Sequence, residues 1–261
     1  MRPVPVLMYH HINPHKGDMV TTTPETFEKH MGYLHKAGYR TLNTRELLSY
    51  IKGDLLLKEK AVLITFDDGW LDNYIYAFPV LKQYKINATV FLVTNWIDEA
   101  SKNILSLNQH IPTHGESCKL VKKNQGNKVV LNWELICKMA DSGLVEFHSH
   151  TKSHRKCTKI EERDLSEEFS ESKKSIEKQV GKVCDCLCWP MGRYNDSAIK
   201  IADAIGYKSM FTTDHGVNTE NSNPKLIKRI AVKNSELWFK KSMTIYSNSV
   251  LSGLYLSIKK R

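Results

Sequence analysis

The 261-residue sequence lacks the marks of membrane and secreted proteins. No apolar run approaches the roughly 20 residues that a membrane-spanning helix requires. The opening stretch, "MRPVPVLMYHHI", has a short apolar patch but no small-residue cleavage site, which is typical of a first strand rather than a signal peptide. We therefore expect a cytoplasmic globular protein of one or two domains.

The sequence has no CxxC pair, and its six cysteines do not resemble a disulfide framework. Cys118, Cys137 and Cys157 are scattered along the chain. The other three cysteines alternate in "CDCLC" (184–188), so on a strand they would face one side. A thiolate metal site is the alternative there, although metal-binding thiols usually occur in CxxC pairs with loop spacing. We expect reduced, half-buried thiols.

Excess charge is nearly absent from most of the chain. The net charge is +10, but residues 225–261 hold nine basic side chains and one acidic side chain, a net charge of +8. Only +2 remains for the first 224 residues. Charge of this size does not favour nucleic-acid binding by the body of the protein, so we predict no nucleic-acid partner.

The sequence does contain a regular alternation of short apolar runs and amphipathic stretches. Strands are predicted at 5–10, 61–66, 88–93, 144–150, 184–190, 207–213 and 225–232, with helices at 24–37, 71–84, 132–143, 164–180 and 195–205. This alternation predicts an α/β fold in which helices cover a parallel sheet or barrel. Residues 98–130 are polar and aperiodic, and we interpret them as an inserted loop region beside the strand ends.

Two polar motifs follow predicted strands and belong together chemically. "TFDDGW" (65–70) places Asp67 and Asp68 directly after an apolar run, and "HSHTKSH" (148–154) places His150 and His154 four residues apart. Two imidazoles and one carboxylate make an open divalent-metal site, and the cation would offset the repulsion of the acidic pair. The other carboxylate could then act as a base. Either motif alone is more often a turn or a pair of solvated histidines.

The motifs "TFDDG", "HTKSH" and "WPMG", in this order, resemble those of the polysaccharide deacetylases of carbohydrate esterase family 4. "PVLMYHHI" and "NWELICKMADSGLVEFHSHT" are most similar to the subgroup that deacetylates poly-N-acetylglucosamine. The resemblance covers roughly residues 3–232. It implies a distorted (β/α) barrel of about seven parallel strands and the hydrolysis of N-acetyl groups on amino sugars.

The resemblance also implies roles for individual residues. Zn²⁺, or Co²⁺, Ni²⁺ or Mn²⁺ in its place, would be bound by Asp68, His150 and His154. Asp67 would be the general base, and His10 of the opening "YH" the acid. The substrate-binding candidates are Pro190, Met191 and Gly192, with the Met191 N–H as oxyanion donor, and Trp189, whose ring could stack on a sugar.

Two positions depart from the pattern of most of the family. Cys188 stands where an arginine orients the base, and "IKRIAV" stands near the place of a late leucine-x-histidine motif. Both departures are shared by the subgroup with the early histidine, which we interpret as a variant of the same machinery. We expect His11 to be structural and His148 to support the site or pack in the core.

The tail differs in character from the rest of the chain. We predict that residues 1–234 form the catalytic domain and that residues 235–261 form a basic amphipathic helix. That helix would pack on the barrel, or alternatively lie on an anionic membrane at the inner face.

The prediction for the whole chain is a metal-dependent hydrolase. It would remove N-acetyl groups from an amino sugar of a surface polysaccharide or of its lipid-linked or oligosaccharide precursor. The alternatives are a same-fold amidohydrolase for a small non-sugar amide and a glycan-binding pseudoenzyme.

Overall fold

The computed structural model describes residues 2–102 and 111–259. Its strands are β1 (Val6–Tyr9), β2 (His11–Ile12), β3 (Thr21–Thr22), β4 (Arg40–Thr41), β5 (Ala61–Phe66), β6 (Ala88–Leu92), β7 (Val145–Ser149), β8 (Cys186–Cys188), β9 (Ser209–His215) and β10 (Ile227–Ala231). Its α-helices are α1 (Pro24–Lys36), α2 (Thr44–Lys52), α3 (Phe78–Tyr84), α4 (Thr94–Ser101), α5 (His114–Lys122), α6 (Trp133–Asp141), α7 (Glu162–Val180), α8 (Asp196–Ile205), α9 (Glu236–Tyr246) and α10 (Ser249–Lys259). Short helical turns complete the set: η1 (Asn73–Ala77), η2 (Gly126–Lys128), η3 (Cys157–Lys159), η4 (Pro190–Gly192) and η5 (Pro224–Leu226).

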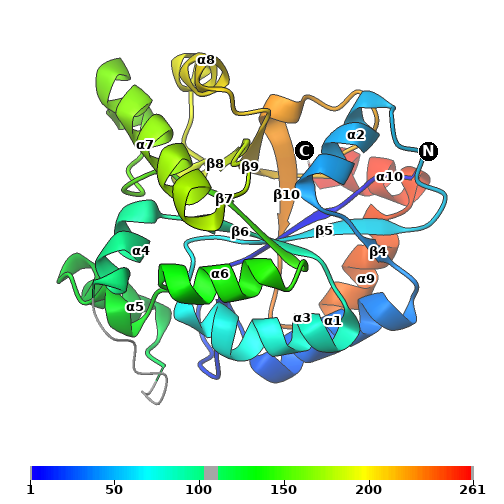
Figure 1. The fold of residues 1–261 in the computed structure, drawn as a ribbon. Helices are drawn as coiled ribbons and strands as arrows, with labels where there is room; N and C mark the ends of the chain where they lie inside the picture. The colour runs from blue at the N-terminus through cyan, green and yellow to red at the C-terminus, as the bar shows by residue number, and fades with distance from the viewer. Residues whose placement is uncertain (1, 103–110, 260–261) are drawn as a thin grey trace.

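Seven parallel strands close into a barrel. Their order is β1, β10, β9, β8, β7, β6 and β5, and β5 pairs again with β1. The short β4 pairs with the start of β5, while β2 and β3 form a separate pair. Helices surround this ring (Figure 1). The predicted distorted (β/α) barrel is confirmed. Helices connect most of its parallel strands, whereas β10 follows β9 through a segment with only the short turn η5.

The strands are buried on both faces, as a covered parallel barrel requires. All six residues of β5 are buried. One face of the strands contributes Leu63, Phe91 and Phe211 to an inner cluster that α2 also joins, while the other face packs under the helices. Cys186 and Cys188 belong to the inner cluster.

The thiols of "CDCLC" are more deeply buried than the sequence suggested. All six cysteines are unpaired, which agrees with reduced thiols. Cys184, Cys186 and Cys188 are fully buried rather than half-buried, because the strand that carries two of them is covered on both sides.

Local signals in the sequence explain several helix ends. Thr23 caps α1 with its side chain, and Pro24 occupies the first turn, as expected from its fixed backbone angle. Helix η1 gives way to α3 at Phe78, and Pro79 occupies the first turn of α3. Gly181 ends α7 in the left-handed conformation.

The inserted region 98–130 contains more regular structure than its composition suggested. Thr113 and Glu116 form a reciprocal capping box that starts α5, and η2 follows it. Residues 103–110 lie outside the described residues, so the expectation of a loop there stays a prediction. The spacing of Thr113 and Glu116 in the sequence is typical of a helix start. The helix has no apolar stripe to indicate it, because it is short and only Ser117 is buried within it.

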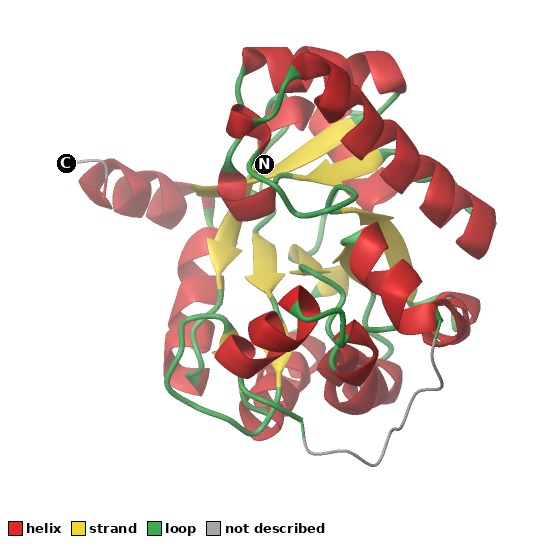
Figure 2. Ribbon diagram, turned by 90° about the vertical axis from the view of Figure 1, so that its left-hand side faces the viewer, coloured by secondary structure: helices red, strands yellow, loops and turns green. Residues whose placement is uncertain are grey.

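The C-terminal segment forms two helices instead of one. Asn248 accepts backbone hydrogen bonds from Val250 and Leu251 and so begins a new helix after α9 ends. Helix α9 buries Phe239, Met243 and Tyr246 against the barrel's outer shell, whereas α10 extends outward (Figure 2). Among the described helices, none has the length and apolar character to cross a membrane.

Candidate active site

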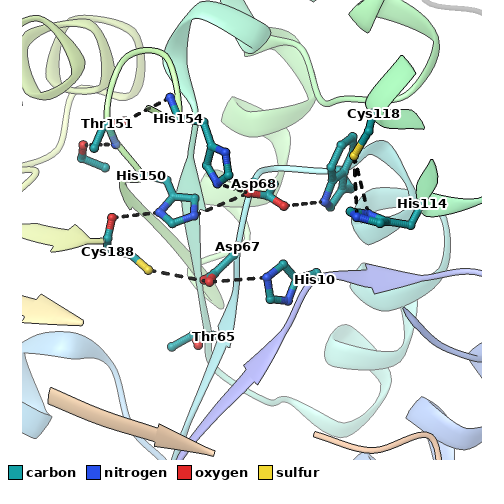
Figure 3. A network of polar contacts seen from close by, with 12 residues as sticks. His10, Thr65, Asp67, Asp68, His114, Cys118, His150, Thr151, His154 and Cys188 are labelled. Carbon is teal, nitrogen blue, oxygen red and sulfur yellow. Dashed lines mark hydrogen bonds and ion pairs between the residues drawn. The ribbon is translucent and has the colours of Figure 1, made fainter. Parts of the chain in front are cut away.

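Several polar side chains meet at the carboxyl ends of the barrel strands. Asp67 and Asp68 directly follow β5, His150 follows β7, and His10 follows β1 (Figure 3). The third predicted metal ligand, His154, lies in the loop beyond β7, and its ring returns to Asp68. Parallel strands align their carboxyl ends on one rim, which explains how motifs more than 80 residues apart in the sequence become neighbours.

The three predicted metal ligands converge. Asp68 Oδ1 lies 3.5 Å from His150 Nε2 and 3.4 Å from His154 Nε2. Atoms bound to one tetrahedral zinc at about 2.0–2.1 Å are about 3.3–3.4 Å apart. The spacing therefore fits three ligands around one ion, and the three residues form a group whose ligand atoms lie within 4.8 Å of one another.

The hydrogen bonds of this group leave Asp68 Oδ1 and His150 Nε2 available to bind an ion. Asp68 Oδ2 accepts from the Trp70 indole N–H at 2.9 Å, while Asp68 Oδ1 is buried and makes no hydrogen bond within the described residues. His150 Nδ1 lies 2.8 Å from the Cys188 carbonyl oxygen, which can only accept, so this nitrogen carries the proton.

The remaining lone pair of His150 faces a carboxylate. Burial lowers the pKa of His150 to about 4, so the ring is neutral near pH 7 and Nε2 is an acceptor. A lone pair and a carboxylate oxygen 3.5 Å apart repel each other unless a cation lies between them. The residues present therefore fit a divalent metal ion.

Asp67 has a different partner that the sequence reasoning missed. Arg229, on β10, donates from Nη1 to Asp67 Oδ1 at 2.7 Å and from Nη2 to Oδ2 at 2.8 Å. Both side chains are almost fully buried. Burial on its own would raise the pKa of Asp67, but the guanidinium outweighs it and holds that pKa well below its usual range. The sequence signal for this partner was an arginine within a predicted strand, "KLIKRIAV" (225–232).

Arg229, rather than the residue at position 188, forms the ion pair with Asp67. The Cys188 thiol lies 3.7 Å from Asp67 Oδ2 and 3.0 Å from Arg229 Nη2. Asp67, His150 and Cys188 form another group of potential ligands within 4.8 Å. Because Arg229 already holds both Asp67 oxygens and contacts the sulfur, this group is less suited to an ion than that of Asp68.

His10 lies on the rim of the site. Its Nε2 is 3.8 Å from Asp67 Oδ2, and its side chain is 20% exposed. Asn73 donates from Nδ2 to the His10 carbonyl oxygen at 2.8 Å, which fixes the backbone there. The neighbouring His11 points elsewhere, into a buried 2.6 Å contact with Asp72, as expected for a structural residue.

Strained backbone gathers around the site. Asp68, Thr151, His154 and Met191 have φ values between 55° and 76°, the left-handed region that non-glycine residues seldom occupy. Such conformations cost about 1–3 kcal/mol each and persist only where the surroundings hold them. Gly192 shows how tight the fit is, because a Cβ there would lie 2.0 Å from Thr213 Oγ1.

The "WPMG" stretch divides between core and surface. Pro190 is buried, while Met191 is 47% exposed. Trp189 is fully buried, stacks on Tyr194 and meets Phe169 edge-on. Its ring therefore offers no exposed face on which a sugar could stack.

A cavity of about 570 Å³ opens beside His154. The cavity lies between α4, the end of α5 with the segment after it, and the histidine loop. Trp96 lines the cavity, and its ring centroid is 5.3 Å from that of His154. In the inserted region, the His114 ring meets that of Trp70 edge-on at 6.1 Å, and the Cys118 thiol lies beside His114, as Figure 3 shows. The aperiodic sequence gave no signal for these residues beyond the location of the insertion.

Sequence comparisons agree with this geometry. Residues 56–210 match the family model described as polysaccharide deacetylase. The chain is 31% identical over 229 residues to Bacillus subtilis YxkH, named for a polysaccharide deacetylase, over 88% of this chain and 71% of that protein. It is 27% identical over 216 residues to a Staphylococcus aureus poly-β-1,6-N-acetyl-D-glucosamine N-deacetylase, over 79% of this chain. The chain spans 66% of that staphylococcal protein.

A solved structure has the same fold. The Streptococcus pyogenes deacetylase PplD, in complex with acetate, superposes with a TM-score of 0.78 at 24% identity and covers 92% of this chain and 98% of its own. The family match spans more than half of the sequence, and the Bacillus relative is similar over nearly all of it. The chain therefore belongs to the polysaccharide deacetylase family.

Proposed function

We propose that this protein is a metal-dependent N-deacetylase for an amino sugar of a surface polysaccharide or its precursor. The observation that carries the proposal is the convergence of Asp68 Oδ1 with the two Nε2 atoms of His150 and His154, next to a carboxylate held by Arg229. An open metal site beside an ionised carboxylate is an arrangement for hydrolysis.

Asp68, His150 and His154 would hold the ion, which we propose to be zinc, with cobalt, nickel and manganese as other ions that suit these ligands. When bound, such an ion supplies Lewis-acid chemistry: it lowers the pKa of water towards about 7 and polarises a carbonyl oxygen. The Trp70 indole and the Cys188 carbonyl orient Asp68 and His150 for that task.

Asp67 is the proposed base. It accepts a proton from the water that attacks the acetamide carbonyl, while Arg229 fixes its position. His10 donates a proton to the departing amine nitrogen. Because His10 Nε2 and Asp67 Oδ2 are only 3.8 Å apart, the proton gained by Asp67 can return to His10 and restore both groups.

The exposed turn at Met191 is the proposed acetyl site. We propose the Met191 main-chain N–H as the oxyanion donor, because this turn follows β8 and Met191 has a left-handed backbone. Each such donor to a developing oxyanion contributes about 3–4 kcal/mol in other hydrolases. Pro190 and Gly192 would shape the pocket. Trp189 supports the turn from beneath, since its ring is buried.

The cavity beside His154 is the proposed place for the sugar. The half-buried Trp96 offers an aromatic surface, and Asn95 and Lys122 offer polar groups. Saccharides present both apolar ring faces and hydroxyl groups, which suits this mixture. Residues 1–234 would form the catalytic domain, and a role for the tail at a membrane, like a cytoplasmic location, stays a prediction.

The test measures acetate released from N-acetylglucosamine oligomers by the purified chain. We expect release from the oligomers, and a loss of about 10²–10⁴-fold in Asp67→Asn with metal content unchanged. Release from small non-sugar amides but not from oligomers would favour the amidohydrolase alternative. Oligomer binding without any release would favour a pseudoenzyme.

A further inference from the structure

A second set of ligand-type side chains lies deeper in the barrel. His148 on β7 and Cys186 on β8 are each two residues before His150 and Cys188, so they face the same interior about 6–7 Å further down the strands. The ladder pairs Ser149 with Leu187, which makes His148 and Cys186 lateral neighbours. Asp185 immediately precedes β8.

The atoms of this set are close enough to share an ion. His148, Asp185 and Cys186 each offer a ligand atom, and these atoms lie within 4.8 Å of one another. Cys186 Sγ is 3.5 Å from Asp185 Oδ1. An imidazole, a thiolate and a carboxylate are a donor set that zinc and cobalt accept.

His148 is oriented as metal-bound histidines usually are. Its Nε2 lies 3.2 Å from Thr44 Oγ1 and 3.7 Å from Glu146 Oε2. Glu146 is itself fixed, because its Oε1 accepts from the Thr44 N–H and from the Thr89 hydroxyl, each at 2.7 Å. A carboxylate behind one ring nitrogen favours the proton there and leaves the other nitrogen free to bind an ion.

The other ring nitrogen makes no hydrogen bond of normal geometry, although the Cys184 and Cys186 side chains interact with the ring. His148 is 4% exposed, and its Nδ1 is a buried atom with no hydrogen bond among the described residues. An unsatisfied buried polar atom destabilises a fold, so a ligand that would satisfy it has a physical reason to bind. Asp68 Oδ1, at the first site, is unsatisfied in the same way.

Cys186 is placed as a thiolate ligand would be. The Ser209 hydroxyl, on β9, donates to Cys186 Sγ at 3.1 Å. A donor directed at sulfur stabilises the thiolate, which is the form that binds metal. Of the three cysteines in "CDCLC", Cys186 belongs to this group, whereas Cys188 contacts Asp67 and Arg229.

An entry path reaches this position from the end of the barrel remote from Asp68. A cavity of about 580 Å³ is lined by His148 and Glu146 and by residues that precede β6, β7 and β8, among them Asn87, Leu144 and Lys182. An ion could therefore reach His148 without crossing the candidate active site.

We propose that His148, Asp185 and Cys186 form a second transition-metal site, selective for zinc-like ions, that links β7 to β8 inside the barrel. The site goes beyond the proposed deacetylation and does not depend on it. Its expected role is structural, because its ligands lie on adjacent strands and face the barrel interior below the rim that carries the candidate active site.

Cobalt substitution tests the site, because a Co²⁺–thiolate bond gives a near-ultraviolet charge-transfer band that histidine and carboxylate ligands do not give. We expect this band in the full chain loaded with Co²⁺ alone. It should disappear in Cys186→Ser and persist in the matched control Cys188→Ser. A wild-type chain without the band, or a band that depends on Cys188, would overturn the proposal.

Metal counting on the wild-type chain keeps the test independent of whether a variant folds. After equilibration with Zn²⁺ and dialysis, we expect two equivalents per chain. His154→Ala should lose one equivalent while its Co²⁺ form keeps the thiolate band, and His148→Ala should lose the band. One equivalent in the wild type, with no thiolate band in its Co²⁺ form, contradicts the second site and leaves the first intact.

Discussion

At the scale of single residues, the base of the proposed reaction is defined by a partner on a distant strand. Asp67 follows β5 and Arg229 lies in β10, 162 positions later, yet two hydrogen bonds of 2.7 and 2.8 Å join them in the barrel interior. A bidentate guanidinium fixes both the position and the charge of a carboxylate. Cys188 stands where most of the family has an arginine, and in this chain Arg229 of β10 provides the guanidinium instead.

Replacing Arg229 by methionine should destabilise the fold and reduce activity together. The change leaves the Asp67 carboxylate buried without a counter-charge, which costs about 3–5 kcal/mol. Chemical denaturation measures the cost, and the matched control is the same change in an Asp67→Asn background, where it should be much smaller. Equal costs in the two backgrounds would show that the pair is not coupled.

The neutral, buried His150 predicts a pH dependence of stability for the metal-free chain. Its pKa is about 4 when folded and about 6.5 when unfolded, so the unfolded chain binds the extra proton between these values. The free energy of unfolding should therefore be highest above pH 6.5 and fall by about 3 kcal/mol towards pH 4.

Denaturation of chelator-treated protein at several pH values checks this slope. His150→Gln should remove its share of the decline. His30, whose pKa is also lowered to about 4 by burial, should contribute a separate share that His30→Gln removes. A slope unchanged by His150→Gln would mean that this ring is not held neutral in the folded chain.

At the scale of elements, the two C-terminal helices differ in what they bury. Helix α9 places Phe239 against His30 of α1, with ring centroids 4.0 Å apart, and also buries Met243 and Tyr246. Helix α10 leaves Val250, Leu254 and Ile258 exposed. The first is part of the barrel's outer shell, and the second is an appendage.

Two truncations separate these roles. Ending the chain after Asn248 removes α10 and should shift the melting temperature by only a few degrees, since little apolar area is lost. Ending it after Asn234 also removes the buried side chains of α9. Each of these contributes about 2–5 kcal/mol, so their joint loss should abolish the cooperative transition. Similar melting curves for both truncations would contradict the different contributions of α9 and α10 to stability.

At the scale of the whole molecule, the sequence predicted the barrel and the meeting of its two motifs, because strand–helix alternation and strand-end motifs are local signals. It did not predict the pairing of Arg229 with Asp67, since that contact depends on the order and register of strands in a closed ring. The break at Asn248 was missed because an apolar stripe continued across it. The burial of Trp189 depended on packing against Phe169 and Tyr194.

The central claim is that Asp68, His150 and His154 hold a metal ion that N-acetyl hydrolysis requires. The most direct measurement is acetate release from N-acetylglucosamine oligomers by chelator-treated protein, before and after Zn²⁺ is added back, with Asp68→Ala in parallel. The account predicts no release before addition, recovery after it, and no recovery in Asp68→Ala. Undiminished release by the chelated wild type, or recovery by Asp68→Ala, would contradict it.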